Sequence, residues 1–161
     1  MLFAGLAIRG SMMSKKLTSR GCHTVLPIVG DTLVEVRLSI SSLPALVFKA
    51  EDGSEAELTI EDRTTLRRGE QEQLLEGSKP GSSFNPKKLA PLLELLGSAV
   101  IDAVAQKEGL LRIAFSNELV LEVAPSHGYE AWHFHSPRPG RPASGDREQA
   151  IALHGAHGHL I

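Results

Sequence analysis

The sequence predicts an α+β domain that consists mainly of antiparallel β meanders and carries one short Leu-rich helix. Three observations support this fold class: apolar and polar residues alternate in several short runs, turn residues separate these runs, and only one segment has helical spacing. Alternation with a period of two indicates half-buried strands. Tight turns between such runs indicate antiparallel neighbours. We expect one domain over residues 23–135 of the 161-residue chain.

Residues 1–22 are expected to form an N-terminal tail. The apolar run that opens it is short and has no basic residue before it, so it matches neither a secretory signal nor a membrane span. Met12 and Met13 precede a polar stretch that resembles a natural start. We interpret residues 1–11 as either the product of an upstream start codon or a frayed end.

The first predicted meander begins with a strand over residues 32–40. Its apolar positions should share the core face: Val34, Val36, Leu38 and Ile40. A hairpin follows, with strands over residues 45–49 and 55–60 and an Asp-Gly turn between them. Residues 25–29 add a short strand before the meander, and Pro27 assigns it to a sheet edge because proline cannot donate to a central ladder.

One helix is predicted between the two meanders. Residues 61–84 carry mixed charges without periodicity, which predicts a solvated segment with a short hairpin around Gly69. The helix follows at residues 86–96 and ends at Gly97, and it is either kinked at Pro91 or begins its regular part there. Its apolar stripe is expected at Leu89, Leu92, Leu93 and Leu96.

A second meander should follow the helix, with strands over residues 99–106, 111–115 and 119–123. The core face of its first strand is expected at Ala99, Ile101, Ala103 and Ala105. Residues 46–62 and 111–126 both consist of a strand, a polar turn and a second strand. This similarity is consistent with duplication of a three-strand unit, although any antiparallel meander would match in part.

The stretch HGYEAWHFHS at residues 127–136 is predicted to form a final core strand. Alternation assigns Trp132 and Phe134 to one face and His133 and His135 to the other. We expect the two aromatic residues to face the core.

Residues 136–148 should form an exposed loop, because they are rich in Pro, Gly and Arg, and residues 149–161 a terminal strand with a His-rich tail. His133 and His135 lie two positions apart on one predicted strand, so both could bind one metal ion. The tail supplies further imidazoles at His154, His157 and His159. Solvent-exposed imidazoles without a metal are the alternative interpretation.

A carboxylate near the same strand is the second candidate site. Glu130 is expected beside Trp132 and Phe134, at the edge of an apolar surface. There it would either form a structural ion pair or line a small-ligand or hydrolytic pocket with Tyr129 and Trp132.

Composition excludes several classes of function. Hydrophobic residues make up 42% of the chain and charged residues 22%, and the net charge of -2 offers no basic surface for nucleic acid or membranes. The single cysteine, Cys22, rules out an internal disulfide and suits a reducing cytoplasm. Cys22 and His23 are adjacent and point apart on an extended chain, so they form no catalytic pair. Phosphate-binding loops and nucleophile elbows are missing from the sequence, and we predict neither a catalytic residue nor a cofactor.

The segments LELLGSAVIDAV, GLLRIAFSNELVLEVAP and GYEAW together resemble a family of small uncharacterised bacterial proteins with a C-terminal Tyr-Glu-Ala-Trp motif. The matching residues are Leu95, Leu96, Gly97, Gly109, Leu111, Tyr129, Glu130, Ala131 and Trp132. The match covers residues 25–135 and implies a fold shared across bacteria, with no established activity to transfer. The His clusters depart from the family pattern, which counts against a metal site common to the family.

The preferred functional prediction is a non-catalytic module that binds another protein, such as a toxin that it neutralises or a protein that it regulates. This prediction follows from the missing catalytic motifs and from the charged loops of a small β domain. The oligomeric state is not predicted. The alternatives are the pocket around Tyr129, Glu130 and Trp132 and the metal site at His133 and His135.

Overall fold

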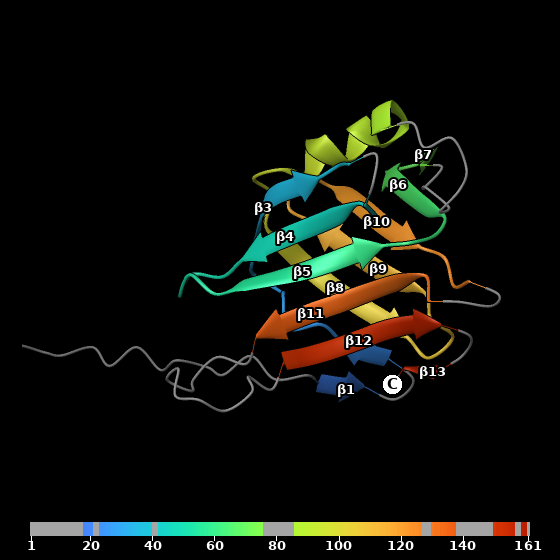
Figure 1. Ribbon diagram of the computed structural model, residues 1–161. Coiled ribbons are helices and arrows are strands. Elements are labelled where there is room, and N and C mark those ends of the chain that lie inside the picture. Colours follow the sequence, from blue (N-terminus) through green and yellow to red (C-terminus); the bar gives the residue numbers. More distant parts are fainter. Residues whose placement is uncertain are drawn as a thin grey trace, which may run out of the picture.

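The computed structural model describes residues 18–20, 23–39, 42–75, 86–126, 130–137, 150–156 and 159–160. The described strands form two antiparallel sheets that pack face to face, and one short helix lies across the end of the pair (Figure 1). The predicted class, mainly antiparallel β structure with a single short helix, is confirmed for this part of the chain. Tyr129, Cys22, His157 and residues 138–149 lie outside the described residues. Of the loop expected over residues 136–148, residues 136 and 137 belong instead to the strand that spans Trp132–Pro137.

The six-stranded sheet contains the first meander and the C-terminal strands. In spatial order its strands are β13 (His159–Leu160), β12 (Ala150–Ala156), β11 (Trp132–Pro137), β5 (Glu55–Ile60), β4 (Ala45–Lys49) and β3 (Thr32–Arg37). The seven-stranded sheet contains the second meander. Its order is β1 (Thr18–Arg20), β2 (His23–Val25), β8 (Val100–Gln106), β9 (Leu111–Phe115), β10 (Leu119–Val123), β6 (Thr64–Arg68) and β7 (Gln71–Leu75).

Most of the predicted strands are present, but the edge strand expected over residues 25–29 is not: β2 ends at Val25 and lies between β1 and β8, and residues 27–30 form a turn. The hairpins β4–β5 and β9–β10 occur at the expected residues, and β6 and β7 form the short hairpin around Gly69. That hairpin is less solvated than expected, because Thr64, Leu66 and Leu75 are buried. Strands β1 and β12 extend the sheets beyond the predicted limits of residues 23–135.

The first strand of each meander contains a β-bulge, which the alternation rule did not predict. The register shifts between Leu33 and Glu35 in β3 and between Val100 and Asp102 in β8. An extra residue in one strand moves one side chain to the opposite face. Val34 and Ile101 are therefore exposed, and their predicted assignment to the core face is wrong.

The helix η1 spans Pro86–Leu95 and is a 3-10 helix with Pro91 inside it. Because a 3-10 helix has three residues per turn, positions three apart share a face. Leu89, Leu92 and Leu95 accordingly face the core, whereas Leu93 and Leu96 are exposed. The predicted stripe, which assumed 3.6 residues per turn, is therefore wrong for Leu93 and Leu96.

The core lies between the two sheets and below η1. Its largest fully buried side chains include Trp132, Phe48, Phe115, Phe134, Leu26, Ile28 and Leu33. The indole Nε1–H of Trp132 donates a hydrogen bond of 2.8 Å to the carbonyl oxygen of Gly109, so this bond joins β11 to the turn before β9. The predicted burial of Trp132 and Phe134, opposite the more exposed His133 and His135, is confirmed.

The two sheets meet along a short ladder between the segment before β3 and the segment before β8. Thr32 forms an isolated antiparallel bridge with Ala99. The other backbone bonds of this ladder run from Leu33 N to Ser98 O (3.0 Å), Val100 N to Asp31 O (2.8 Å), Gly97 N to Leu33 O (2.8 Å) and Gly30 N to Val100 O (2.8 Å). We call this ladder, residues 30–33 with 97–100, the seam.

The seam bonds repeat after 67 positions along the chain. Leu33 and Val100 are 67 positions apart, as are Gly30 and Gly97. The bond from Leu33 N to Ser98 O thus has its counterpart in the bond from Val100 N to Asp31 O. Thr32 pairs with the residue 67 positions after it, Ala99, so an approximate two-fold axis passes between these two residues.

Candidate functional site

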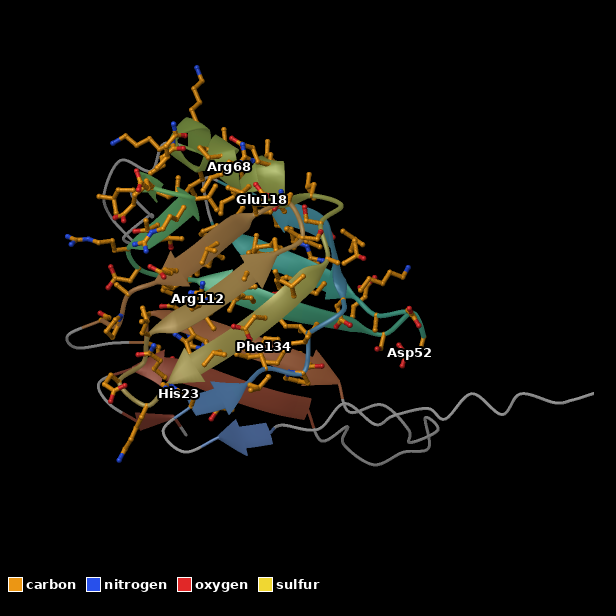
Figure 2. The ribbon with its side chains drawn as sticks, turned by 180° about the vertical axis from the view of Figure 1, so that it is seen from behind. His23, Asp52, Arg68, Arg112, Glu118 and Phe134 are labelled. Carbon is orange, nitrogen blue, oxygen red and sulfur yellow. The ribbon has the colours of Figure 1, made fainter. Side chains whose placement is uncertain are left out.

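Exposed apolar side chains gather around the seam. Within the described residues, five of the six exposed large apolar side chains lie on or beside it, with 39–60% of their surface exposed: Val29, Val34, Leu93, Leu96 and Ile101. We call these five residues the seam patch. The sixth, Leu74, is in β7, separated from β8 by three strands. Figure 2 shows the blue strand β3 beside the start of the yellow-green strand β8, where the patch lies.

The local backbone explains why the seam patch is exposed. Val34 and Ile101 occupy the two bulges, where a side chain leaves the core face of its strand. Val29 and Leu96 each precede a glycine with positive φ: 88° at Gly30 and 78° at Gly97. These turns direct the chain into the seam and leave the preceding side chain outside.

The sequence contains a signal for this surface that strict alternation does not reveal. Residues 29–35 read VGDTLVE and residues 96–102 read LGSAVID. Both consist of an apolar residue, a glycine, a polar and a small residue, two apolar residues and an acid. Two neighbouring apolar residues before an acid break strict alternation, and this break marks the bulge in each strand.

The charged side chains next to the seam patch form ion pairs among themselves. Glu35 follows Val34 and binds the Nε of Arg37 at 3.0 Å, and Asp102 follows Ile101 and lies 3.5 Å from Nη1 of Arg112. Glu94 of η1 lies 3.3 Å from Nη2 of Arg68 in β6. An apolar centre with paired charges at its edge is typical of protein interfaces.

The ion pair of Glu35 predicts a small pH dependence of stability. The hydrogen bond from Arg37 lowers the pKa of the Glu35 carboxyl below its ordinary value of 4.5. A carboxyl with a lowered pKa in the folded state stabilises that state above its ordinary pKa and loses this contribution as the pH falls through the lowered value. Glu35→Gln should therefore lower the unfolding free energy slightly at neutral pH and leave it unchanged in acid. Solvent exposure keeps the effect small.

Denaturant unfolding at both pH values measures this difference, and Glu108→Gln, in an exposed turn, is the matched control. An equal effect of Glu35→Gln at neutral and acidic pH would contradict the ion pair.

Of the predicted pocket residues the structure describes Trp132 and Glu130, and these two do not lie side by side as expected. Trp132 is fully buried, with its indole N–H bonded to Gly109, so it presents no surface to a ligand in this structure. Glu130 lies before the start of β11, so the alternation of side chains between the two faces of that strand does not determine where Glu130 points. Its Oε2 lies 3.1 Å from Nε2 of His133 on the outer side of the sheet, not beside the buried face of Trp132.

His133 instead contacts two acidic residues, Glu61 and Glu130, that are distant from each other in the sequence. Its Nε2 contacts the carboxylates of both Glu61 and Glu130. The strand register places His154 of β12 directly opposite His133, and Glu57 of β5 opposite His135. Within the described residues, however, no group of three or more His, Cys, Asp or Glu side chains is arranged to hold a metal ion.

None of the helices in the described part of the chain is long and apolar enough to cross a membrane.

Comparisons with known proteins locate the chain in a family but give it no activity. Neither a curated protein nor a solved structure matches the sequence. One family model matches residues 24–149, and this range contains both meanders, the seam and β11. The chain therefore belongs to DUF6188, a family of unknown function.

Proposed function

We propose that this protein acts without catalysis, by binding another protein through the seam patch. The observation that supports the proposal is the concentration of five exposed apolar side chains around one backbone feature. Scattered single apolar residues are normal on protein surfaces, whereas a clustered apolar area with a polar edge marks an interaction site. The partners that such a surface fits are a toxin to be neutralised or a protein to be regulated in a bacterial cytoplasm, or a second copy of this chain.

The backbone around the patch suits a binding role. The seam joins both sheets through at least four backbone hydrogen bonds of 2.8–3.0 Å, so its main chain is held from both sides. A surface that is already ordered loses little conformational entropy when a partner binds. Val34 and Ile101 are thereby presented on fixed bulges and not on loops.

Ile101→Lys should weaken partner binding strongly without unfolding the protein. Ile101 is 60% exposed, so the substitution should change the unfolding free energy by no more than about 0.5 kcal/mol. A lysine ammonium in the contact must lose its water, which would weaken binding by about 2 kcal/mol or more. Pull-down from a lysate of the native host, with wild-type and variant proteins compared by mass spectrometry, tests this.

Leu74→Lys is the matched control, because Leu74 is also a large exposed apolar residue but lies at the far edge of the seven-stranded sheet. Partners retained by Ile101→Lys and by wild type alike would contradict the binding of a different protein at this surface.

We also infer that the two meanders are copies of one duplicated three-strand unit. Each begins with a bulged strand and continues into a hairpin, and each then sends its next strand to the opposite sheet: β6 pairs with β10, and β11 pairs with β5. The bonds at these two crossings also correspond. Glu61 N donates to Ala131 O at 2.8 Å, and Ala124 N donates to Arg63 O at 3.0 Å.

The other predicted functions have weaker support. A ligand pocket that uses Trp132 would require this buried ring to move. A metal site at His133 and His135 would compete with the contacts of His133 to Glu61 and Glu130. Stoichiometric metal in protein purified without an affinity tag would support the metal site.

A further inference from the structure

We propose that the partner at the seam patch is a second copy of this chain, and that two copies form a closed dimer with two-fold symmetry. The inference rests on the proposed function, since it requires the seam patch to be an interaction surface. It adds the identity of the partner and the symmetry of the contact. Three features of the seam support it: its internal symmetry, its charge and its backbone.

The first feature is the approximate two-fold axis of the patch. Val34 and Ile101 are 67 positions apart, as are Val29 and Leu96, and the axis passes between Thr32 and Ala99. Val34 and Ile101 each lie two residues beyond this bridged pair, at opposite ends of the ladder. A facing copy of the same patch therefore meets apolar side chains at both ends of the contact, and the patch is complementary to itself.

The second feature is the lack of exposed charge at the centre of the patch. In a two-fold contact each group near the axis faces its own copy, so an unpaired charge there would face a like charge. Between residues 29 and 34 and between residues 96 and 101 the only charged residue is Asp31, which is 4% exposed. A partner of different sequence would place no such requirement on the patch.

The charges at the edge of the patch also fit a second copy. Glu35 and Asp102, which are 67 positions apart, lie at its two ends. Each is an acid, so each would approach an acid of the other copy. Arg37 and Arg112 neutralise them within the same chain, which removes this repulsion.

The third feature is the pairing of the seam backbone. Seam residues on both strands already exchange hydrogen bonds with one another, so the contact offers few free backbone groups to an added strand. Association would therefore occur through side chains, in a closed contact that does not propagate into a filament.

Sedimentation equilibrium of the full chain tests the inference. We expect a concentration-dependent dimer for the wild type and for Leu74→Lys. Ile101→Lys should raise the dimer dissociation constant about 30-fold or more, the usual effect of losing a central interface residue. A wild-type protein that stays monomeric throughout, or an Ile101→Lys variant that dimerises like the wild type, would overturn the inference.

Mixing two variants tests the symmetry. In a two-fold contact Ile101 faces either Ile101 or its counterpart Val34 of the other copy. Ile101→Lys, Ile101→Glu and Val34→Glu should each dimerise more weakly than the wild type, and the equimolar mixture of Ile101→Lys with one of the two Glu variants should dimerise more tightly than its components. Two mixtures that are both no tighter than their components would contradict a two-fold contact at this patch.

The same proteins separate failure of the inference from failure of the proposed function. If the wild type is monomeric and Ile101→Lys loses a lysate partner that Leu74→Lys retains, the second-copy inference fails and the proposed function stands. If the wild type is monomeric and both variants retain the same partners, both fail.

Discussion

Trp132→Ala should lower the free energy of unfolding by about 3–5 kcal/mol, the range for removal of a buried aromatic ring. Trp132 is fully buried between the sheets and is the only tryptophan of the chain. Phe134 lies two residues further along the same strand, and Ile60 is the register partner of Trp132 in β5. Removing the indole ring leaves a cavity next to these two side chains and deletes the hydrogen bond to Gly109. Because the substitution also removes the main fluorophore, denaturant unfolding is best followed by far-ultraviolet circular dichroism.

Two further variants divide the Trp132 effect into parts. Trp132→Phe keeps most of the ring but removes the donor to the buried Gly109 carbonyl, so we expect a loss of about 1–3 kcal/mol. His135→Ala is the control on the same strand, and its exposed side chain should change stability by no more than about 0.5 kcal/mol. A loss below about 1 kcal/mol for Trp132→Ala would contradict its place in the core.

Phe48→Ala and Phe115→Ala should each lower the free energy of unfolding by about 3–5 kcal/mol and by similar amounts. Both rings are almost completely buried. Phe48 pairs in register with Leu33, and Phe115 with Val100, in both cases next to the bulge. If the two meanders are copies of one unit, as we propose, equivalent positions meet similar neighbours and should contribute similar stability.

Phe48→Leu and Phe115→Leu provide the same comparison if the alanine variants fail to fold. Lys49→Ala and Lys107→Ala, at exposed positions at the end of β4 and just after β8, are the controls. A large loss for one phenylalanine and almost none for the other would argue against equivalent units.

Local patterns predicted the strands well, because their causes are local. The hairpins β4–β5 and β9–β10 follow from alternation on either side of a tight turn. The same rule placed Trp132 and Phe134 in the core and His133 on the other face. The position of helix η1 was predicted correctly, but its 3-10 type was not. The 3-10 geometry is recognised from the burial of Leu95 in place of Leu96, which only the structure shows.

The candidate sites were predicted less well, because they depend on register and on distant segments. Val34 and Ile101 were expected inside, and a bulge is visible only when the partner strand shows which positions pair. Glu130 was expected beside Trp132, but the strand starts two residues later and Glu130 contacts His133. No local pattern connects Glu61 with His133, since these residues meet only when β5 pairs with β11.

Sequence alone determined most of the strands, their turns and the face of each regular strand, since these follow from side-chain period and turn chemistry over a few residues. Tertiary structure decided where the period breaks, which segments meet at the seam and which apolar side chains remain in solvent. The physical reason is that a bulge and a seam satisfy the backbone hydrogen bonds of two strands at once. The exposure of Val34 and Ile101 is thus a property of the pair of strands, and neither strand specifies it by itself.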